Sequence, residues 1–364
     1  MKKIVFGITN LDLGGAERVL VDITNDLVNK YDVTIFTLYG NGTFLKELDK
    51  KVKVVSMYDK TRNDLSFVTK KLLSFRLVTD SLRKKIYDKY IAGKYEIEVA
   101  FLEGPITWIF SEESDARKIA WIHNDIEDVF NGNESKKELN RKAYEKYNEL
   151  IFVSEDNLKK FKKYFKDNKV HKQVIYNYLN KTLVTNKASK LIPNEIDKKV
   201  LSFVQVSRLV DQKAVKRLIR VHAKLINDGY EHKIYIVGDG PLRQELEDKI
   251  KELGVKKTFI LLGAKPNPYP YIKKGNYFIL TSYYEGYPMV LLEAKSLEKY
   301  IMITDSAARE TLKGYESSMI VNNSEPGIYE GLKNIIVNKP KVVNKKNNKE
   351  EDILKEIINC LEGE

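Results

Sequence analysis

Short runs of β-forming residues alternate with helical patterns along most of this chain, and this alternation restricts the fold more than any other feature. The strand-like runs of the first half are 3–8, 33–38, 52–56, 97–102, 118–122, 150–153 and 173–176. Those of the second half are 200–206, 233–237, 259–262, 277–280 and 301–303. Strands that alternate with helices form parallel sheets, and 364 residues exceed the size of one ordinary core. We therefore expect an α/β protein of two doubly wound domains that face a central cleft.

A lysine-rich stretch between the two halves interrupts the pattern and sets the expected boundaries. Residues 1–180 are expected to form the first domain, 181–199 a linker and 200–340 the second domain. Residues 341–364 begin as a polar tail and continue as a helical pattern. The apolar face of this helix consists of Ile353, Leu354, Ile357, Ile358 and Leu361. Because an amphipathic helix buries its apolar face, we expect it to pack against a domain.

Charge and cysteine content exclude several classes of protein. There are 63 Lys and Arg residues against 51 Asp and Glu, and the net charge of +12 favours anionic partners. The single cysteine, Cys360, cannot form an internal disulfide, and no Cys and His cluster could hold zinc. No apolar run is long enough to span a membrane, and residues 1–10 are typical of a first strand rather than a signal segment. A cytoplasmic setting fits these features.

Two of the loops that follow strands carry groups suited to an anion. Gly14 and Gly15 precede a helix, so their amides can approach an anion at its positive end, although an ordinary glycine turn has the same sequence. Their spacing differs from the dinucleotide fingerprint, which disfavours a dehydrogenase. Arg208 and Lys213 follow the strand at 200–206 and can together neutralise a diphosphate. The next basic residues are expected to form a solvated helix face: Lys216, Arg217 and Arg220.

A third loop holds two carboxylates. In the stretch YYEGYPMVLLEA, Glu285 precedes a helix that Pro288 begins, and Glu293 lies inside that helix. Carboxylates in this position can accept hydrogen bonds from the paired hydroxyls of a ribose or a hexose. Metal binding is the alternative use, but no aspartates cluster nearby to complete an oxygen shell.

The order of these loops resembles that of the retaining glycosyltransferases of family four. The resemblance is carried by Gly14-Gly15, Arg208 with Lys213, the GDGP turn at 238–241, Glu285-x7-Glu293 and the stretch NPYPYIKKGNYFILTSYYEGYPMVLLEAKSL. It implies the GT-B fold, in which two Rossmann-like domains face a cleft. The chain departs from the family at Ser207 and Ala214, where relatives commonly have glycine, which narrows the approach to the donor phosphates.

The resemblance also implies a role for each residue. Arg208 and Lys213 would bind the donor diphosphate, and Glu293 would bind the nucleotide ribose. Glu285 would meet the transferred sugar, and His123 in WIHND would lie beside it. The expected catalytic residues are therefore Glu285, His123, Arg208 and Lys213. The expected donor-binding residues are Gly14, Gly15, Arg208, Lys213, Gly286, Tyr287, Met289, Val290 and Glu293.

The activity that the resemblance implies is hexosyl transfer with retention of configuration, in polysaccharide biosynthesis. The donor would be a nucleotide-diphosphate sugar, UDP-linked, and the acceptor a glycan hydroxyl, lipid-linked, with no metal or other cofactor required. One alternative is a basic nucleic-acid-binding protein, which the net charge suggests but no recognition motif supports, so we expect no nucleic-acid partner. Another alternative is a GT-B sugar-binding protein without catalysis.

A basic amphipathic segment at 66–90 suggests peripheral contact with the anionic inner face of the cell membrane. The side chains expected to face lipid are Phe67, Leu72, Phe75, Leu82 and Ile86. Those expected to meet head groups are Lys70, Lys71, Arg76, Arg83, Lys84 and Lys85. The alternative is a pair of ordinary domain helices with a solvated basic side.

Overall fold

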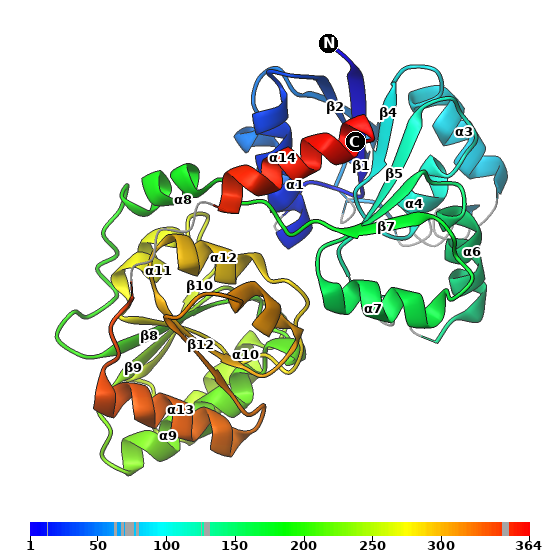
Figure 1. The fold of residues 1–364 in the computed structure, drawn as a ribbon. Helices are drawn as coiled ribbons and strands as arrows, with labels where there is room; N and C mark the ends of the chain where they lie inside the picture. Colours follow the sequence, from blue (N-terminus) through cyan, green and yellow to red (C-terminus); the bar gives the residue numbers. More distant parts are fainter. Residues whose placement is uncertain are drawn as a thin grey trace. The chain divides into compact units, whose positions relative to one another are not determined.

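The protein consists of two compact units, each built around a parallel β-sheet (Figure 1). The computed structural model describes residues 1–12, 14–61, 64–66, 69, 76–77, 80–124, 126, 132–343 and 349–364. The first unit comprises residues 1–179 and 348–364, and the second comprises residues 180–347. Both units are α/β with helices between successive strands, as the sequence predicts.

The first unit contains a seven-stranded sheet in the order β3-β2-β1-β4-β5-β6-β7. Its strands are β1 Lys3–Ile8, β2 Asp32–Tyr39, β3 Lys53–Tyr58, β4 Ile97–Ala100, β5 Arg117–Ile122, β6 Glu149–Phe152 and β7 His171–Val174. Its helices are α1 Gly15–Leu27, η1 Thr43–Glu47, α3 Asp80–Tyr90, α4 Pro105–Phe110, α6 Glu134–Tyr144, α7 Glu155–Tyr164 and α14 Lys349–Glu362. The strand order reverses between β1 and β4, so the loops after these strands flank the place where doubly wound sheets bind ligands.

The second unit contains a six-stranded sheet in the order β10-β9-β8-β11-β12-β13. Its strands are β8 Ser202–Val206, β9 Lys233–Val237, β10 Phe259–Gly263, β11 Tyr277–Leu280, β12 Tyr300–Thr304 and β13 Ser318–Val321. Its helices are α8 Lys181–Ala188, η2 Asp211–Lys213, α9 Val215–Asn227, α10 Arg243–Glu252, α11 Tyr269–Lys274, α12 Met289–Ser296, η3 Ala307–Leu312 and α13 Glu325–Asn338. The order reverses between β8 and β11, and both of the following loops carry predicted site residues.

The structure differs from the expected boundaries at two places. The segment expected as a linker, 181–199, begins with α8, which contacts α11 and α12 and belongs to the second unit. The helix α14, which the sequence left unplaced, packs on the first unit (Figure 1). Its side chains Ile357 and Leu361 are fully buried.

Polar contacts fasten α14 to the first unit as well. The Tyr31 hydroxyl donates to Glu362 Oε1 at 2.6 Å, and Arg117 Nη2 on β5 donates to the Cys360 carbonyl at 2.9 Å. Burial raises the pKa of the Cys360 thiol to about 12, so the thiol is neutral and packs as an apolar side chain. This helix is therefore an integral part of the first unit.

The structure corrects part of the expected membrane contact. Ile86 and Leu82 pack against the hydrophobic core of the first unit, so the expectation that they face lipid is wrong. Arg83 is also buried, and its Nη1 donates to the Leu77 carbonyl at 3.3 Å, whereas Lys84 is exposed and pairs with Asp88 at 2.9 Å. The expected contacts of Phe67, Lys70, Lys71, Leu72 and Phe75 lie outside the described residues. Within the described part of the chain, no helix combines the length and the apolar character needed to cross a membrane.

Candidate active site

The two loops with the predicted donor-binding residues lie side by side at the carboxyl edge of the second sheet. The strands before these loops, β8 and β11, are parallel neighbours, so the two loops leave the sheet at the same edge. The Tyr283 amide donates to the Gln212 carbonyl at 2.9 Å, and Gln212 Nε2 donates to the Tyr284 carbonyl at 3.0 Å. These bonds join the loop of Lys213 to the loop of Glu285.

Lys213 and Glu285 form an ion pair in which Nζ lies 2.5 Å from Oε1. The Ser282 hydroxyl donates to the same oxygen at 2.5 Å. Both charged side chains are largely buried, with 15% of Lys213 and 7% of Glu285 exposed, so water screens the pair weakly. An ammonium group has three donors, so Lys213 can hold Glu285 and an anionic ligand together. The sequence assigned these residues to different parts of the donor, but the structure brings them into direct contact.

Arg208 lies just after the end of β8, and its side chain is exposed. It makes no hydrogen bond or ion pair with any residue in the described ranges. The two cations predicted to bind the diphosphate therefore differ, because Lys213 is already neutralised by a carboxylate and Arg208 is not. An unpaired guanidinium presents a complete fork of donors to an anion.

The turn after β9 supports the Arg208 loop by close backbone contact. The Leu209 amide donates to the Asp239 carbonyl at 3.0 Å. A Cβ atom added to Gly238 would lie 1.9 Å from the Ser207 carbonyl oxygen, and one added to Gly240 would lie 2.5 Å from the Leu209 carbonyl oxygen. Both glycines are therefore required by packing.

Glu293 lies on α12 and is buried, with the Tyr269 hydroxyl 3.3 Å from its Oε1. The helix begins at Met289, and no side chain in the described part of the protein caps its amino terminus. Its first amides thus remain oriented toward the loop of Glu285. The other predicted donor-binding residues of this region, Gly286, Tyr287 and Val290, are half-buried in the same loop and first turn.

Ala214 adopts a left-handed backbone conformation between Lys213 and α9, with φ 51° and ψ 32°. This conformation explains why glycine is common here among the relatives that the sequence resembles, because a Cβ atom in it costs roughly 1–2 kcal/mol. Against this, glycine loses roughly 0.5–1 kcal/mol more backbone entropy on folding than alanine.

We therefore expect Ala214→Gly to raise the free energy of unfolding by about 0.5–1 kcal/mol, measured by urea denaturation. Ala223→Gly is the matched control, because Ala223 lies inside α9, where the same replacement should destabilise the protein by about 1 kcal/mol. Equal destabilisation by both replacements would show that Ala214 is not strained.

In the first unit, His123 follows β5 in an apolar environment. Its ring lies 4.6 Å from the Phe101 ring centroid and 6.4 Å from that of Trp121. Although the residue as a whole is only half-buried, Nε2 is enclosed and meets no hydrogen-bond partner among the residues that the structure describes. Burial disfavours the imidazolium and lowers the pKa of His123 to about 3. The ring is therefore neutral at physiological pH.

Glu103 is a residue at this site that the sequence reasoning missed. Its Oε1 accepts hydrogen bonds from the backbone amides of His123, at 2.5 Å, and Asn124, at 2.7 Å. Its Oε2 accepts from Asn124 Nδ2 at 2.8 Å. Burial raises the pKa of Glu103, although these three hydrogen bonds act in the opposite direction. The available signal was an acidic residue directly after the apolar run at 99–102, which begins in β4. The effect of Glu103 is to fix the backbone that carries His123.

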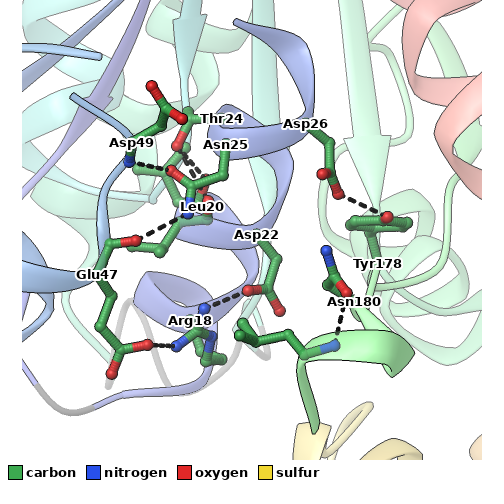
Figure 2. A network of polar contacts seen from close by, with 12 residues as sticks. Arg18, Leu20, Asp22, Thr24, Asn25, Asp26, Glu47, Asp49, Tyr178 and Asn180 are labelled. Atoms are coloured by element: carbon green, nitrogen blue, oxygen red, sulfur yellow. Dashed lines mark hydrogen bonds and ion pairs between the residues drawn. The ribbon is translucent and has the colours of Figure 1, made fainter. Parts of the chain in front are cut away.

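Gly14 and Gly15 were expected to precede a helix, and α1 begins at Gly15, with Gly14 before it in extended conformation. No side chain of the described residues caps the helix. The Glu17 carboxylate lies against Gly14, because a Cβ atom there would be 2.0 Å from Glu17 Oε2. Figure 2 shows the polar network beside this turn, in which Arg18 bonds to Asp22 and, at 2.5 Å, to Glu47. The network fixes the first turns of α1 to η1.

Two more hydrogen bonds hold α1 in place (Figure 2). The Tyr178 hydroxyl, near the end of the first unit, donates to Asp26 Oδ2 at 2.7 Å. Asn25 Nδ2 donates to the Glu47 carbonyl of η1 at 2.9 Å. The predicted anion-binding end of α1 therefore belongs to a well-braced helix. Within the described ranges, no group of three or more His, Cys, Asp or Glu side chains could hold a metal ion.

Comparison with known proteins identifies the family. Residues 186–352 match the family described as glycosyl transferases group 1. The chain carries a group 1 glycosyltransferase domain. The glycosyltransferase is 27% identical, over 92% of its length and 90% of the relative's, to the Campylobacter jejuni N-acetylgalactosamine-N,N'-diacetylbacillosaminyl-diphospho-undecaprenol 4-alpha-N-acetylgalactosaminyltransferase. It is also 27% identical to an uncharacterized glycosyltransferase of Methanocaldococcus jannaschii, over 71% of this chain and 65% of that protein.

Solved structures resemble the glycosyltransferase over its whole length. The crystal structure of Anabaena HepE in complex with UDP and glucose has a TM-score of 0.76 and 16% sequence identity, and the match covers 100% of both chains. With two parallel-sheet units of seven and six strands, the fold is GT-B, as the resemblance implied.

Proposed function

We propose that this glycosyltransferase moves a hexose from a UDP-linked donor to a hydroxyl of a lipid-linked glycan, with retention of configuration and without a metal. The observation that carries the proposal is the buried Lys213–Glu285 pair beside the exposed Arg208, where the strand order of the second sheet reverses. The neighbour HepE was crystallised with UDP and glucose, which supports a UDP-linked donor. The Campylobacter relative is named for a diphospho-undecaprenol substrate, which supports a lipid-linked acceptor.

In the proposed reaction, electrostatic stabilisation of the leaving UDP supplies most of the rate enhancement. Arg208 binds the diphosphate through its fork of donors, and Lys213 links the diphosphate to Glu285. The uncapped amino terminus of α12 adds partial positive charge at the same place. Glu293 accepts hydrogen bonds from the ribose hydroxyls.

In this proposal Glu285 accepts hydrogen bonds from the hydroxyls of the transferred sugar, and the neutral His123 is the group that the family resemblance assigns to the same sugar. The acceptor hydroxyl attacks from the face that UDP leaves, and its proton passes to a donor phosphate oxygen. We propose a cytoplasmic enzyme at the inner face of the cell membrane, because a lipid-linked acceptor is held there.

Thermal unfolding in the presence of a panel of nucleotide sugars tests the donor assignment. A donor at about 100 times its dissociation constant should add about 2.7 kcal/mol to the free energy of unfolding. The protecting donor is then assayed for transfer to undecaprenyl-diphosphate-linked glycans, with and without EDTA. Protection by UDP-sugars and EDTA-resistant transfer are expected. Loss of transfer in EDTA would contradict the metal-free mechanism, and protection without transfer would identify an inactive sugar-binding protein.

We expect Arg208→Ala to weaken UDP binding by roughly tenfold to a hundredfold in titration calorimetry. The replacement removes a charge-assisted contact worth about 1.5–3 kcal/mol, and the exposed side chain contributes nothing to packing. Arg220→Ala is the matched control, because the Arg220 guanidinium is already paired with Glu325 and its loss should leave UDP affinity unchanged. If both variants bind UDP like the parent, the phosphate site lies elsewhere.

A further inference from the structure

Arg217 is a buried arginine that the proposed reaction does not use. The sequence predicted that it belongs to a solvated helix face, and this is wrong, because only 3% of the residue is exposed. Its neighbours Lys216 and Arg220 do lie on that face and pair with Glu245 and Glu325. No carboxylate of the described residues pairs with Arg217. A buried guanidinium without a counter-ion is costly, so its hydrogen bonds must compensate.

Those hydrogen bonds all go to the loop of Glu285 and to one asparagine beside it. Arg217 Nη2 donates to the Thr281 carbonyl at 2.6 Å and to the Ser282 carbonyl at 3.2 Å. It also donates to Asn323 Oδ1 at 2.6 Å, and the guanidinium carbon lies 4.3 Å from the centroid of the Tyr283 ring. The arginine therefore contacts three consecutive residues at the end of β11.

Two further side chains complete the support of this loop. Asn323 Nδ2 donates to the Tyr283 carbonyl at 2.7 Å, and the Thr304 hydroxyl donates to the Ser282 carbonyl at 2.6 Å. The carbonyls of residues 281, 282 and 283 are thus all held by side chains from other elements. The side chain of the middle residue, Ser282, donates to Glu285 Oε1 at 2.5 Å. A continuous set of contacts leads from Arg217 to the carboxylate.

We propose that Arg217 is a positioning residue that sets Glu285 for its contact with the transferred sugar, an inference that rests on the proposed function of Glu285. By fixing the backbone where the chain leaves β11, Arg217 places the Ser282 hydroxyl against the carboxylate. The carboxylate then meets Lys213 in one orientation. A lysine at position 217 keeps the charge but has one nitrogen in place of the planar guanidinium. It therefore cannot bond to the acceptors of Nη2 and to the Asn323 carbonyl, which Nη1 reaches at 3.4 Å, while also lying flat over the Tyr283 ring.

The test combines hydrogen exchange with kinetics on Arg217→Lys. Exchange of the amides of residues 281–285 should become at least about tenfold faster, while exchange in the strands of both sheets stays unchanged. The turnover number for transfer should fall by about tenfold or more, and UDP affinity should stay within about twofold of the parent. Arg217→Lys combined with Glu285→Gln should turn over no more slowly than Glu285→Gln alone, because the arginine acts through that carboxylate.

Arg220→Lys is the control on the same helix and should change none of these quantities. If Arg217→Lys does not fold, Asn323→Ala removes both the bond to the Tyr283 carbonyl and an acceptor of Arg217, and it should accelerate the same amides. Unchanged exchange at 281–285, or turnover losses that multiply in the double variant, would overturn the proposal. If the parent shows no transfer with any donor, the proposed function fails, and exchange alone then decides whether Arg217 holds the loop.

Discussion

Glu285→Gln should reduce the turnover number by about a hundredfold or more while UDP binds at least as tightly as to the parent. Glutamine keeps the shape of the side chain but removes the charge that favours hydrogen bonds from sugar hydroxyls. It also removes the ion pair of Lys213. In the variant the carboxylate no longer neutralises the ammonium group, which can then attract the UDP diphosphate at least as strongly as in the parent. Turnover is measured with the donor identified by thermal protection, and UDP affinity is measured by calorimetry.

Glu293→Gln provides the matched comparison, because it is the same replacement in the neighbouring helix. It should weaken UDP binding by roughly tenfold to a hundredfold through the loss of charge-assisted bonds to ribose, at about 1.5–3 kcal/mol. The two variants should therefore affect different steps. A tenfold loss of UDP affinity in Glu285→Gln, or a parental turnover number, would mean that Glu285 does not act on the transferred sugar.

Gly238→Ala should lower the free energy of unfolding by about 2–5 kcal/mol, since it combines backbone strain with a steric clash. The glycine has φ 148°, and an added Cβ atom would lie 1.9 Å from the Ser207 carbonyl oxygen. Relief of this clash has to move the loop that carries Arg208, so UDP affinity should fall as well. Urea denaturation and calorimetry measure the two effects.

Gly229→Ala is the control for Gly238→Ala, because it introduces backbone strain without a steric clash. Gly229 has φ 87°, but, its chain neighbours aside, no atom of the described residues lies within 4 Å of the place that its Cβ would occupy. Its replacement should cost only about 1–2 kcal/mol and leave UDP affinity unchanged. Equal losses of stability in the two variants would mean that the β9 turn does not brace the Arg208 loop.

The alternation of strands and helices predicted nearly all of both sheets, because buried parallel strands are short and continuously apolar. The strand β13 was missed, since it lies at a sheet edge and its Ile320 is exposed, so it lacks that pattern. The resemblance assigned Lys213 and Glu285 to different parts of one donor and did not predict their ion pair. That pair depends on how two loops far apart in sequence leave adjacent strands.

The positions of Arg217 and Glu103 could not be predicted for a different reason. Arg217 stands between a lysine and a leucine in a helix with a strong basic face, so periodicity alone assigns it to solvent. Arg217 is buried because it donates hydrogen bonds to the backbone carbonyls just after β11, and the periodicity of a helix says nothing about those carbonyls. Glu103 accepts amides that lie 20 residues further along the chain. In both cases most of the partners are backbone groups, which leave no mark in a sequence.

The docking of α14 has a consequence for how this protein is made. During synthesis, residues 1–179 emerge from the ribosome first, yet their packing is incomplete until residues 349–364 supply Ile357 and Leu361. The second unit has all the residues of its sheet once β13 has emerged. Multidomain proteins ordinarily complete their amino-terminal domain first. Here the first unit waits for α14, and the second unit can close while the first still lacks that helix.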